Sequence, residues 1–283
     1  MSREFFCHSN LTFTPQALSE RRTRGTFTPV PDLQLVTLVP GRLEVSLPEG
    51  FGLPVFSDEP LDYYSMSLNL NEHDGARRVR FRTTISFTPD GARDRPMTPL
   101  FRRALYAYEP IGKRSPYTMC QSADHPGAAC GMFVGQGASN AFLDSIGKTN
   151  TMHWMIPPGR YESRVPVTDQ LELPADTTAH YVTAHLHPYA RFVSLVDTTT
   201  GMTLFTIWSK DFADRRGVAH IDEWRSIDGV PLHGTHSYEL VTVYDNPTAQ
   251  PIDAMSILYV YAVDTRFQAS LHARVGAADR LTD

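Results

Sequence analysis

The chain has 283 residues, of which 41% are hydrophobic and 20% are charged, so it can bury one large core or two ordinary ones. Its formal net charge of −5 excludes the broad basic surface that nucleic acid binding requires. No apolar run reaches the roughly 18 residues of a membrane-spanning helix, which excludes a helical membrane span.

Short segments rich in Val, Thr, Tyr and Phe, separated by 21 Pro and 18 Gly, are typical of an all-β protein. In the first half of the chain we expect strands over residues 3–13, 33–39, 43–47, 63–70, 79–87 and 102–108. Turns at Pro40-Gly41 and Asp74-Gly75 join two pairs of these strands. The least regular segment follows, and a domain boundary is predicted near residue 150.

In the second half we expect strands over residues 159–167, 179–187, 191–197, 202–208, 217–221, 238–244 and 254–264. No stretch keeps a helical period, so very little helix is expected. No repeat of propeller length is visible, which favours a jelly-roll or Greek-key sandwich. The prediction is two such β-sandwich domains in tandem: residues 1–150 without an obvious metal site, residues 151–270 with one, and a polar tail over 271–283.

The candidate site lies at the end of the strand predicted over 179–187. Side chains two apart on a strand leave the same face, roughly 7 Å apart at the backbone, so His185 and His187 can converge on one ion. Met255 would add a thioether if it faces the same side of a neighbouring strand. Two imidazoles and a thioether suit copper, because the soft sulfur favours Cu(I). The alternatives are a hydrogen-bonded histidine pair and a core methionine.

The same strand predicts what surrounds the pair. Tyr181 and Thr183 share the face of the two histidines, which a reactive site would need to keep accessible to water and oxygen, while His180 points away. Each ligand histidine also needs a partner for its second ring nitrogen, and Asp197, Glu239 or a backbone carbonyl are candidates.

Four segments in fixed order carry a resemblance to a known family: Ile156-Pro-Pro-Gly159, His185-Leu-His187, Tyr238 to Tyr244, and Asp253-Ala-Met255 leading into a Tyr-rich strand. This order resembles the second domain of the copper type II, ascorbate-dependent monooxygenases, the family of peptidylglycine α-hydroxylating monooxygenase and dopamine β-monooxygenase. The resemblance implies that His185, His187 and Met255 bind an oxygen-activating copper.

The first half departs from that family, whose first domain binds a second copper through a His-His pair and a later histidine. No His-His pair exists in this chain, and residues 63–71 contain no histidine. One copper per chain is therefore expected. The chain would be a mono-copper, monooxygenase-like enzyme that uses oxygen and an external reductant on a small organic or peptide substrate. The alternative is a copper protein without turnover, for delivery or sequestration outside the cytoplasm.

Other histidines and the cysteines leave further alternatives open. His8 lies in a first strand that resembles the family's opening strand, and it is either a polar site residue or an exposed histidine. His8, His125 and His153 could assemble a second site. Cys120 and Cys130 flank a polar loop that a disulfide could close, or they are free thiols.

Localisation is expected to be periplasmic or secreted, with the signal peptide absent from this chain. The N-terminus has no apolar segment typical of a signal peptide. A cytosolic chain would look the same here as a mature secreted chain that was given a new initiator Met.

Overall fold

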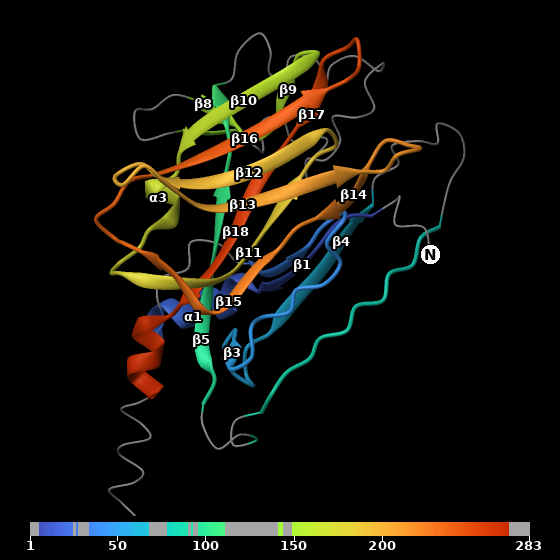
Figure 1. Cartoon of the computed structure of the whole chain (residues 1–283). Helices are drawn as coiled ribbons and strands as arrows, with labels where there is room; N and C mark the ends of the chain where they lie inside the picture. Colours follow the sequence, from blue (N-terminus) through green and yellow to red (C-terminus); the bar gives the residue numbers. More distant parts are fainter. Residues whose placement is uncertain are drawn as a thin grey trace, which may run out of the picture.

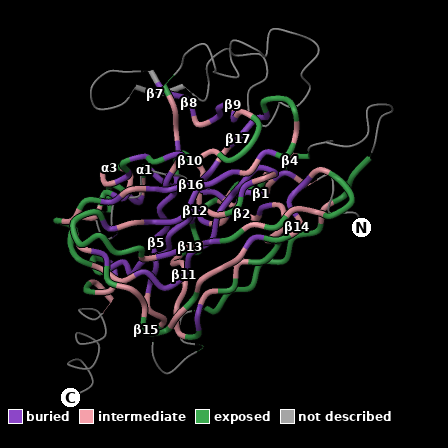
Figure 2. The backbone as a smooth tube through the Cα atoms, turned by 45° about the horizontal axis from the view of Figure 1, so that its top comes forward, coloured by how far each residue is buried: buried purple, intermediate pink, exposed green. Residues whose placement is uncertain are grey.

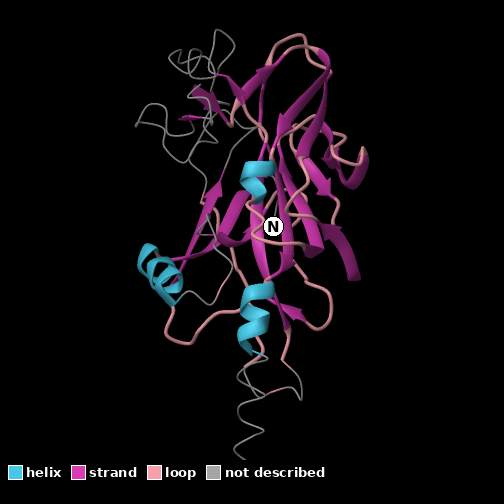
Figure 3. Ribbon diagram, turned by 90° about the vertical axis from the view of Figure 1, so that its left-hand side faces the viewer, coloured by secondary structure: helices cyan, strands magenta, loops and turns pink. Residues whose placement is uncertain are grey.

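The computed structural model describes residues 6–24, 27, 34–67, 78–89, 92, 96–110, 141–143 and 149–271. Strands dominate these residues, which confirms the all-β prediction (Figure 1). The described helices are α1 (Pro15–Arg24), α3 (Thr168–Leu171) and a short helix over residues 265–271. Figure 3 shows how little of the chain they occupy beside the strands. None of these helices is long and apolar enough to cross a membrane.

Two five-stranded sheets form a sandwich. The first has the order β15 (Trp224–Leu232), β11 (Thr177–Leu186), β18 (Ser256–Val263), β5 (Thr98–Tyr106) and β3 (Phe51–Gly52). The second has the order β10 (Gly159–Pro166), β16 (Tyr238–Asn246), β12 (Ala190–Asp197), β13 (Met202–Asp211) and β14 (Val218–Ile221). Buried side chains of both sheets, such as Val182 and Leu195, belong to one hydrophobic core.

Three smaller sheets complete the described fold. One consists of β2 (Gln34–Leu38), β1 (Phe6–Phe13) and β4 (Leu61–Ser67). Another pairs β17 (Ile252–Ala254) with β9 (Trp154–Ile156), and the last joins β6 (Glu109–Pro110), β8 (Thr149–Thr151) and β7 (Ala141–Leu143).

The β1–β2–β4 sheet lies over the outer face of the first large sheet. The Tyr261 hydroxyl of β18 donates to the Leu35 carbonyl of β2 at 3.3 Å, and the Arg102 guanidinium of β5 donates to the Thr37 hydroxyl at 3.0 Å. The middle strands β11 and β18 are therefore covered on both faces, as the buried centre of Figure 2 shows. Tyr181 and Thr183 are both 0% exposed, so the expected water-accessible face is covered by protein instead.

Strands from both sides of residue 150 share one sheet. β5 pairs with β18 in an antiparallel register from Leu100 opposite Val263 to Tyr106 opposite Ile257. A domain boundary near residue 150 would place these hydrogen-bonded neighbours in different domains. Turn residues mark where a strand ends, but they do not show which distant strand it pairs with, which is why sequence periodicity missed this connection.

Several expected features fall differently or outside the described residues. Residues 78–89 have no assigned strand, although Phe81 contacts Phe6 with ring centroids 5.3 Å apart. Cys120, Cys130 and His125 lie outside the described residues, as does the tail from residue 272 onward. Cys7 is the cysteine that lies within the described residues, and it is buried.

Candidate metal centre

His185 and His187 lie together where β11 ends. Their ring centroids are 5.4 Å apart, and the two residues are 4% and 7% exposed. The backbone N–H of His187 donates to the Met255 carbonyl at 3.2 Å, which continues the β11–β18 ladder one step beyond the last assigned pair, Leu186 with Ser256. The period-two spacing thus brings both imidazoles into one buried region.

A third histidine reaches the same region from another element. His153 lies two residues after the end of β8 and directly before β9, and its ring centroid lies 5.3 Å from that of His187. β9 pairs with β17, where Met155 stands opposite Asp253. This small two-stranded sheet therefore sets His153 beside the segment that carries Asp253 and Met255.

Asp253 holds two of these rings at once. Its carboxylate oxygens lie 3.1 Å from Nδ1 of His153 and 3.0 Å from Nδ1 of His187. Burial opposes the charge of this carboxylate, but the neighbouring His153 and His187 hold its pKa well below the usual range. Since an ionised carboxylate only accepts hydrogen bonds, each Nδ1 must carry the proton and donate it.

That tautomer leaves the lone pair of each ring on Nε2. Nε2 of His153 and Nδ1 of His185 are buried and have no hydrogen-bond partner among the described residues. A buried polar atom without a partner costs about 1–3 kcal/mol, so such atoms ordinarily have a bound group to satisfy them. Burial, and then the charge of His187, lower the pKa of His185 well below its usual value, which keeps the ring neutral as a ligand requires.

The centroid spacing of two histidine pairs matches that of two imidazoles bound to one ion. Two imidazoles bound at about 2.0–2.1 Å to one tetrahedral ion have ring centroids about 5.2 Å apart. The observed centroid separations are 5.3 Å for His153 with His187 and 5.4 Å for His185 with His187. Ligand atoms of His153, His187 and Asp253 all lie within 4.8 Å of one another, and His185 is outside this group. Asp253 could therefore ligate directly, but the unsatisfied nitrogens favour it as the partner that orients the rings.

His8 adds a fourth imidazole from the covering sheet. Its ring centroid lies 5.9 Å from that of His185, and Cys7 Sγ lies 3.3 Å from its Nδ1. Burial, and then the charge of His187, lower the pKa of His8 to about 4. Strand β1 therefore turns this histidine toward the pair, so His8 is half-buried beside the site and is not an exposed strand histidine.

Met255 contributes its backbone to the site. Its carbonyl accepts the His187 N–H and also the Tyr244 hydroxyl at 2.6 Å. Its side chain is partly buried and packs against the hydrophobic core. The thioether as a copper ligand stays a prediction.

The carboxylates expected to support the histidines lie elsewhere. Asp197 contacts His236 and Glu239 contacts Arg164, so neither reaches the pair. His180 points away as expected: its ring stacks on Phe51 with centroids 4.2 Å apart. The sequence signal for Asp253 was its place two residues before Met255, within the segment that already suggested the site.

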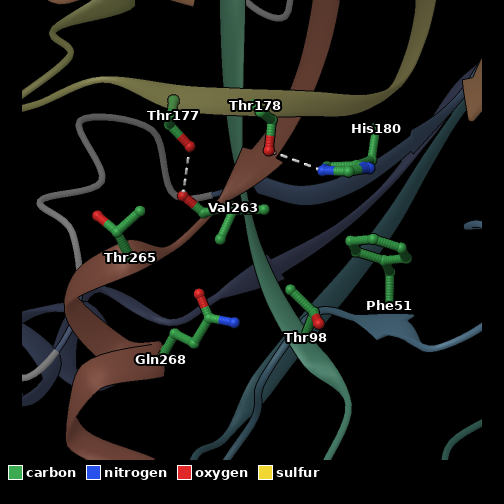
Figure 4. Close-up of a pocket in the computed structure, with 8 residues that line it drawn as sticks. All are labelled: Phe51, Thr98, Thr177, Thr178, His180, Val263, Thr265 and Gln268. Atoms are coloured by element: carbon green, nitrogen blue, oxygen red, sulfur yellow. Dashed lines mark hydrogen bonds between the residues drawn. The ribbon is translucent and has the colours of Figure 1, made fainter. Parts of the chain in front are cut away.

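The opposite end of β11 borders a hollow of about 390 Å³ (Figure 4). Its lining residues are Phe51, Thr98, Thr177, Thr178, His180, Val263, Thr265 and Gln268. The Thr177 hydroxyl donates to the Val263 carbonyl at 2.8 Å, and the Thr178 hydroxyl shares a hydrogen bond with His180 Nε2. Among the described residues this lining has no carboxylate, whereas the histidine site has Asp253.

Comparison with known proteins adds little. No protein-family model matches the chain, and no curated protein matches it. Among solved structures, a chain of the extra small virus virus-like particle of the giant freshwater prawn Macrobrachium rosenbergii is similar at 12% identity and a TM-score of 0.22. That match covers 67% of this chain and 95% of the viral chain, and a TM-score this low carries no argument.

Proposed function

We propose that the chain is a mono-copper protein that holds its ion with the imidazoles of His153, His185 and His187. The observation that carries this proposal is the Asp253 carboxylate, which contacts Nδ1 of His153 and of His187 at 3.1 Å and 3.0 Å. A carboxylate that fixes the tautomer and orientation of a ligand histidine is a recurring feature of protein metal sites.

Copper is proposed over other transition metals for two reasons. Imidazole sites bind Cu(II) more tightly than the other divalent ions of the first transition row. Met255 also directly precedes β18, the strand that pairs with β11 beside the histidines, and its sulfur would stabilise Cu(I). Bound copper would supply one-electron redox chemistry and an open position for oxygen.

The residues of the site perform three tasks. Asp253 keeps protons on two Nδ1 atoms, which presents both Nε2 lone pairs. The Met255 carbonyl anchors the backbone of His187. The covering strand β1 limits the exposure of His185 to 4%, which would slow exchange of the ion with solvent.

This burial favours retention of the ion, and so copper storage or delivery, as the first candidate function. The second candidate is a monooxygenase-like enzyme acting with oxygen and an external reductant, and its support is the order of the His-x-His and acidic-x-Met segments. A small organic or peptide substrate would then have to reach the site past β1.

Metal analysis and an oxygen-consumption assay test these candidates. Reconstituted protein should retain close to one copper after desalting, and His187→Ala should retain much less. Reductant-dependent oxygen uptake coupled to a hydroxylated product from a substrate panel would establish the enzyme. Tight copper without uptake would establish the carrier, and no retained copper in wild type would contradict both.

A further inference from the structure

A second histidine pair lies in the turn between β15 and β16. The sequence His233-Gly234-Thr235-His236 follows Leu232, the last residue of β15, and β16 begins at Tyr238. The two ring centroids are 4.6 Å apart, and the side chains are 43% and 23% exposed. None of the residues of the buried site takes part in this pair.

Each ring is held by its own carboxylate. Nδ1 of His233 lies 2.9 Å from Asp176 Oδ2, and Nδ1 of His236 lies 2.7 Å from Asp197 Oδ2. The hydrogen bonds from His233 and from the Gly234 N–H lower the pKa of Asp176. Burial opposes the charge of Asp197, but the hydrogen bond from His236 and those from Thr200 keep its pKa below the usual value. Both carboxylates therefore accept from Nδ1, which leaves the Nε2 lone pairs for a ligand.

The turn that carries the pair is fixed at several points. The His236 N–H donates to the His233 carbonyl at 3.1 Å, and the buried Tyr238 hydroxyl donates to the same carbonyl at 2.9 Å. The Gly234 N–H donates to Asp176 Oδ1, also at 2.9 Å. Asp197 is anchored as well, because its Oδ1 accepts from the Thr199 N–H at 2.9 Å. These hydrogen bonds hold the turn and the two carboxylates in place before a ligand binds.

We propose that His233 and His236 form a second, solvent-accessible site for a divalent transition-metal ion such as Ni²⁺, bound weakly enough that desalting removes it. Two imidazoles bound at about 2.0–2.1 Å with centroids 4.6 Å apart subtend an angle of about 90° at the ion. That angle belongs to neighbouring positions of a tetragonal or octahedral ion with water at its other positions, a geometry that Ni(II) adopts in its paramagnetic form. Water would fill the other positions at this exposed turn.

Charge supports a divalent ion at the pair. Neutral imidazoles bring no charge, whereas Asp176 and Asp197 bring two negative charges within contact of the rings. One divalent ion therefore neutralises the group. The carboxylates also make the ring nitrogens more basic, as outer partners of metal-bound histidines do.

Calorimetric titration with Ni²⁺ tests the pair without reference to the buried site. The informative variant is His236→Asn, because the asparagine amide nitrogen can occupy the place of Nδ1 and keep the bond to Asp197 while Nε2 is lost. We expect this variant to bind Ni²⁺ at least tenfold more weakly at one site. Asp176→Asn should weaken the same site by about 10–100-fold.

His220→Asn is the matched control, because His220 is an exposed histidine beside one carboxylate, Asp222, at 2.9 Å from its Nε2. Its Ni²⁺ titration should equal that of wild type. Paramagnetic broadening of the His233 and His236 ring signals in wild-type NMR spectra gives a second readout that needs no variant. Unchanged titrations in His236→Asn, or ring signals that Ni²⁺ leaves sharp, would overturn the proposal, whatever the buried site binds.

Discussion

The carboxylate of Asp253 lies 3.0 Å from Nδ1 of His187, and both side chains are less than a tenth exposed. The same carboxylate also contacts His153. Three segments far apart in the sequence therefore meet at one buried negative charge. If this carboxylate affects metal binding, the histidines form an organised metal centre. If it affects only the fold, they are buried together by packing alone.

Asp253→Asn should weaken copper binding by about 10–100-fold, because the neutral amide no longer fixes both Nδ1 protons. Copper affinity measured by chelator competition checks this. Asp245→Asn is the control, since Asp245 forms an exposed ion pair with Arg191 and should change nothing. Equal affinities in wild type and Asp253→Asn would mean that the carboxylate serves only the fold.

Met255→Leu distinguishes the thioether from the backbone of the same residue. The volume is nearly conserved and the carbonyl that accepts the His187 N–H is retained, so unfolding free energy should fall by less than about 1.5 kcal/mol. If sulfur is a ligand, Cu(I) affinity should drop while Cu(II) affinity changes little. If both affinities stay at the wild-type values, the side chain only packs.

Acid should destabilise the metal-free protein through the buried histidines. The pKa of His8 is lowered to about 4 by burial and by the charge of His187. A depressed histidine pKa means that the unfolded chain binds more protons, so stability is lost as pH falls from about 6.5 toward 4. For His8 alone the loss is at most about 3 kcal/mol.

Urea unfolding of metal-free protein between pH 4 and 7 measures this loss. His8→Gln should show a smaller decline over that range, because one titrating group is gone. A decline identical to that of wild type would show that His8 ionises freely in the fold.

Sequence periodicity predicted the local part of this structure. Alternation over residues 179–187 placed His185 and His187 side by side, and the Pro40-Gly41 turn exists, with Gly41 at a φ of 78° between the bridged residues Val39 and Arg42. These features depend on a few neighbouring residues, whose turn chemistry and side-chain alternation are visible in the sequence.

The other residues of the site could not be predicted, because they depend on pairing between strands that are far apart in the sequence. His153 and Asp253 meet because β9 pairs with β17. His8 lies beside His185 because the β1–β2–β4 sheet covers β11. Neither arrangement leaves a periodic signal in one segment. The β5–β18 pair escaped prediction for the same reason, and with it the shared core that spans residue 150.

Asp211 gives a pH effect of the opposite sign. Burial raises the pKa of this carboxyl to about 6, even though the Tyr189 N–H donates to it at 2.8 Å and Arg191 and Arg216 lower it. The folded state therefore holds a proton that the unfolded chain releases near its ordinary pKa of about 3.9. This contribution to stability is complete below that value and is lost as pH rises through 6.

Asp211→Asn retains an acceptor for Tyr189 but cannot ionise, so its unfolding free energy relative to wild type should rise between pH 4 and 7. Urea unfolding at several pH values in the His8→Gln background isolates this effect from the histidines, and a constant difference between the two proteins across that range would show that Asp211 is already ionised in the fold.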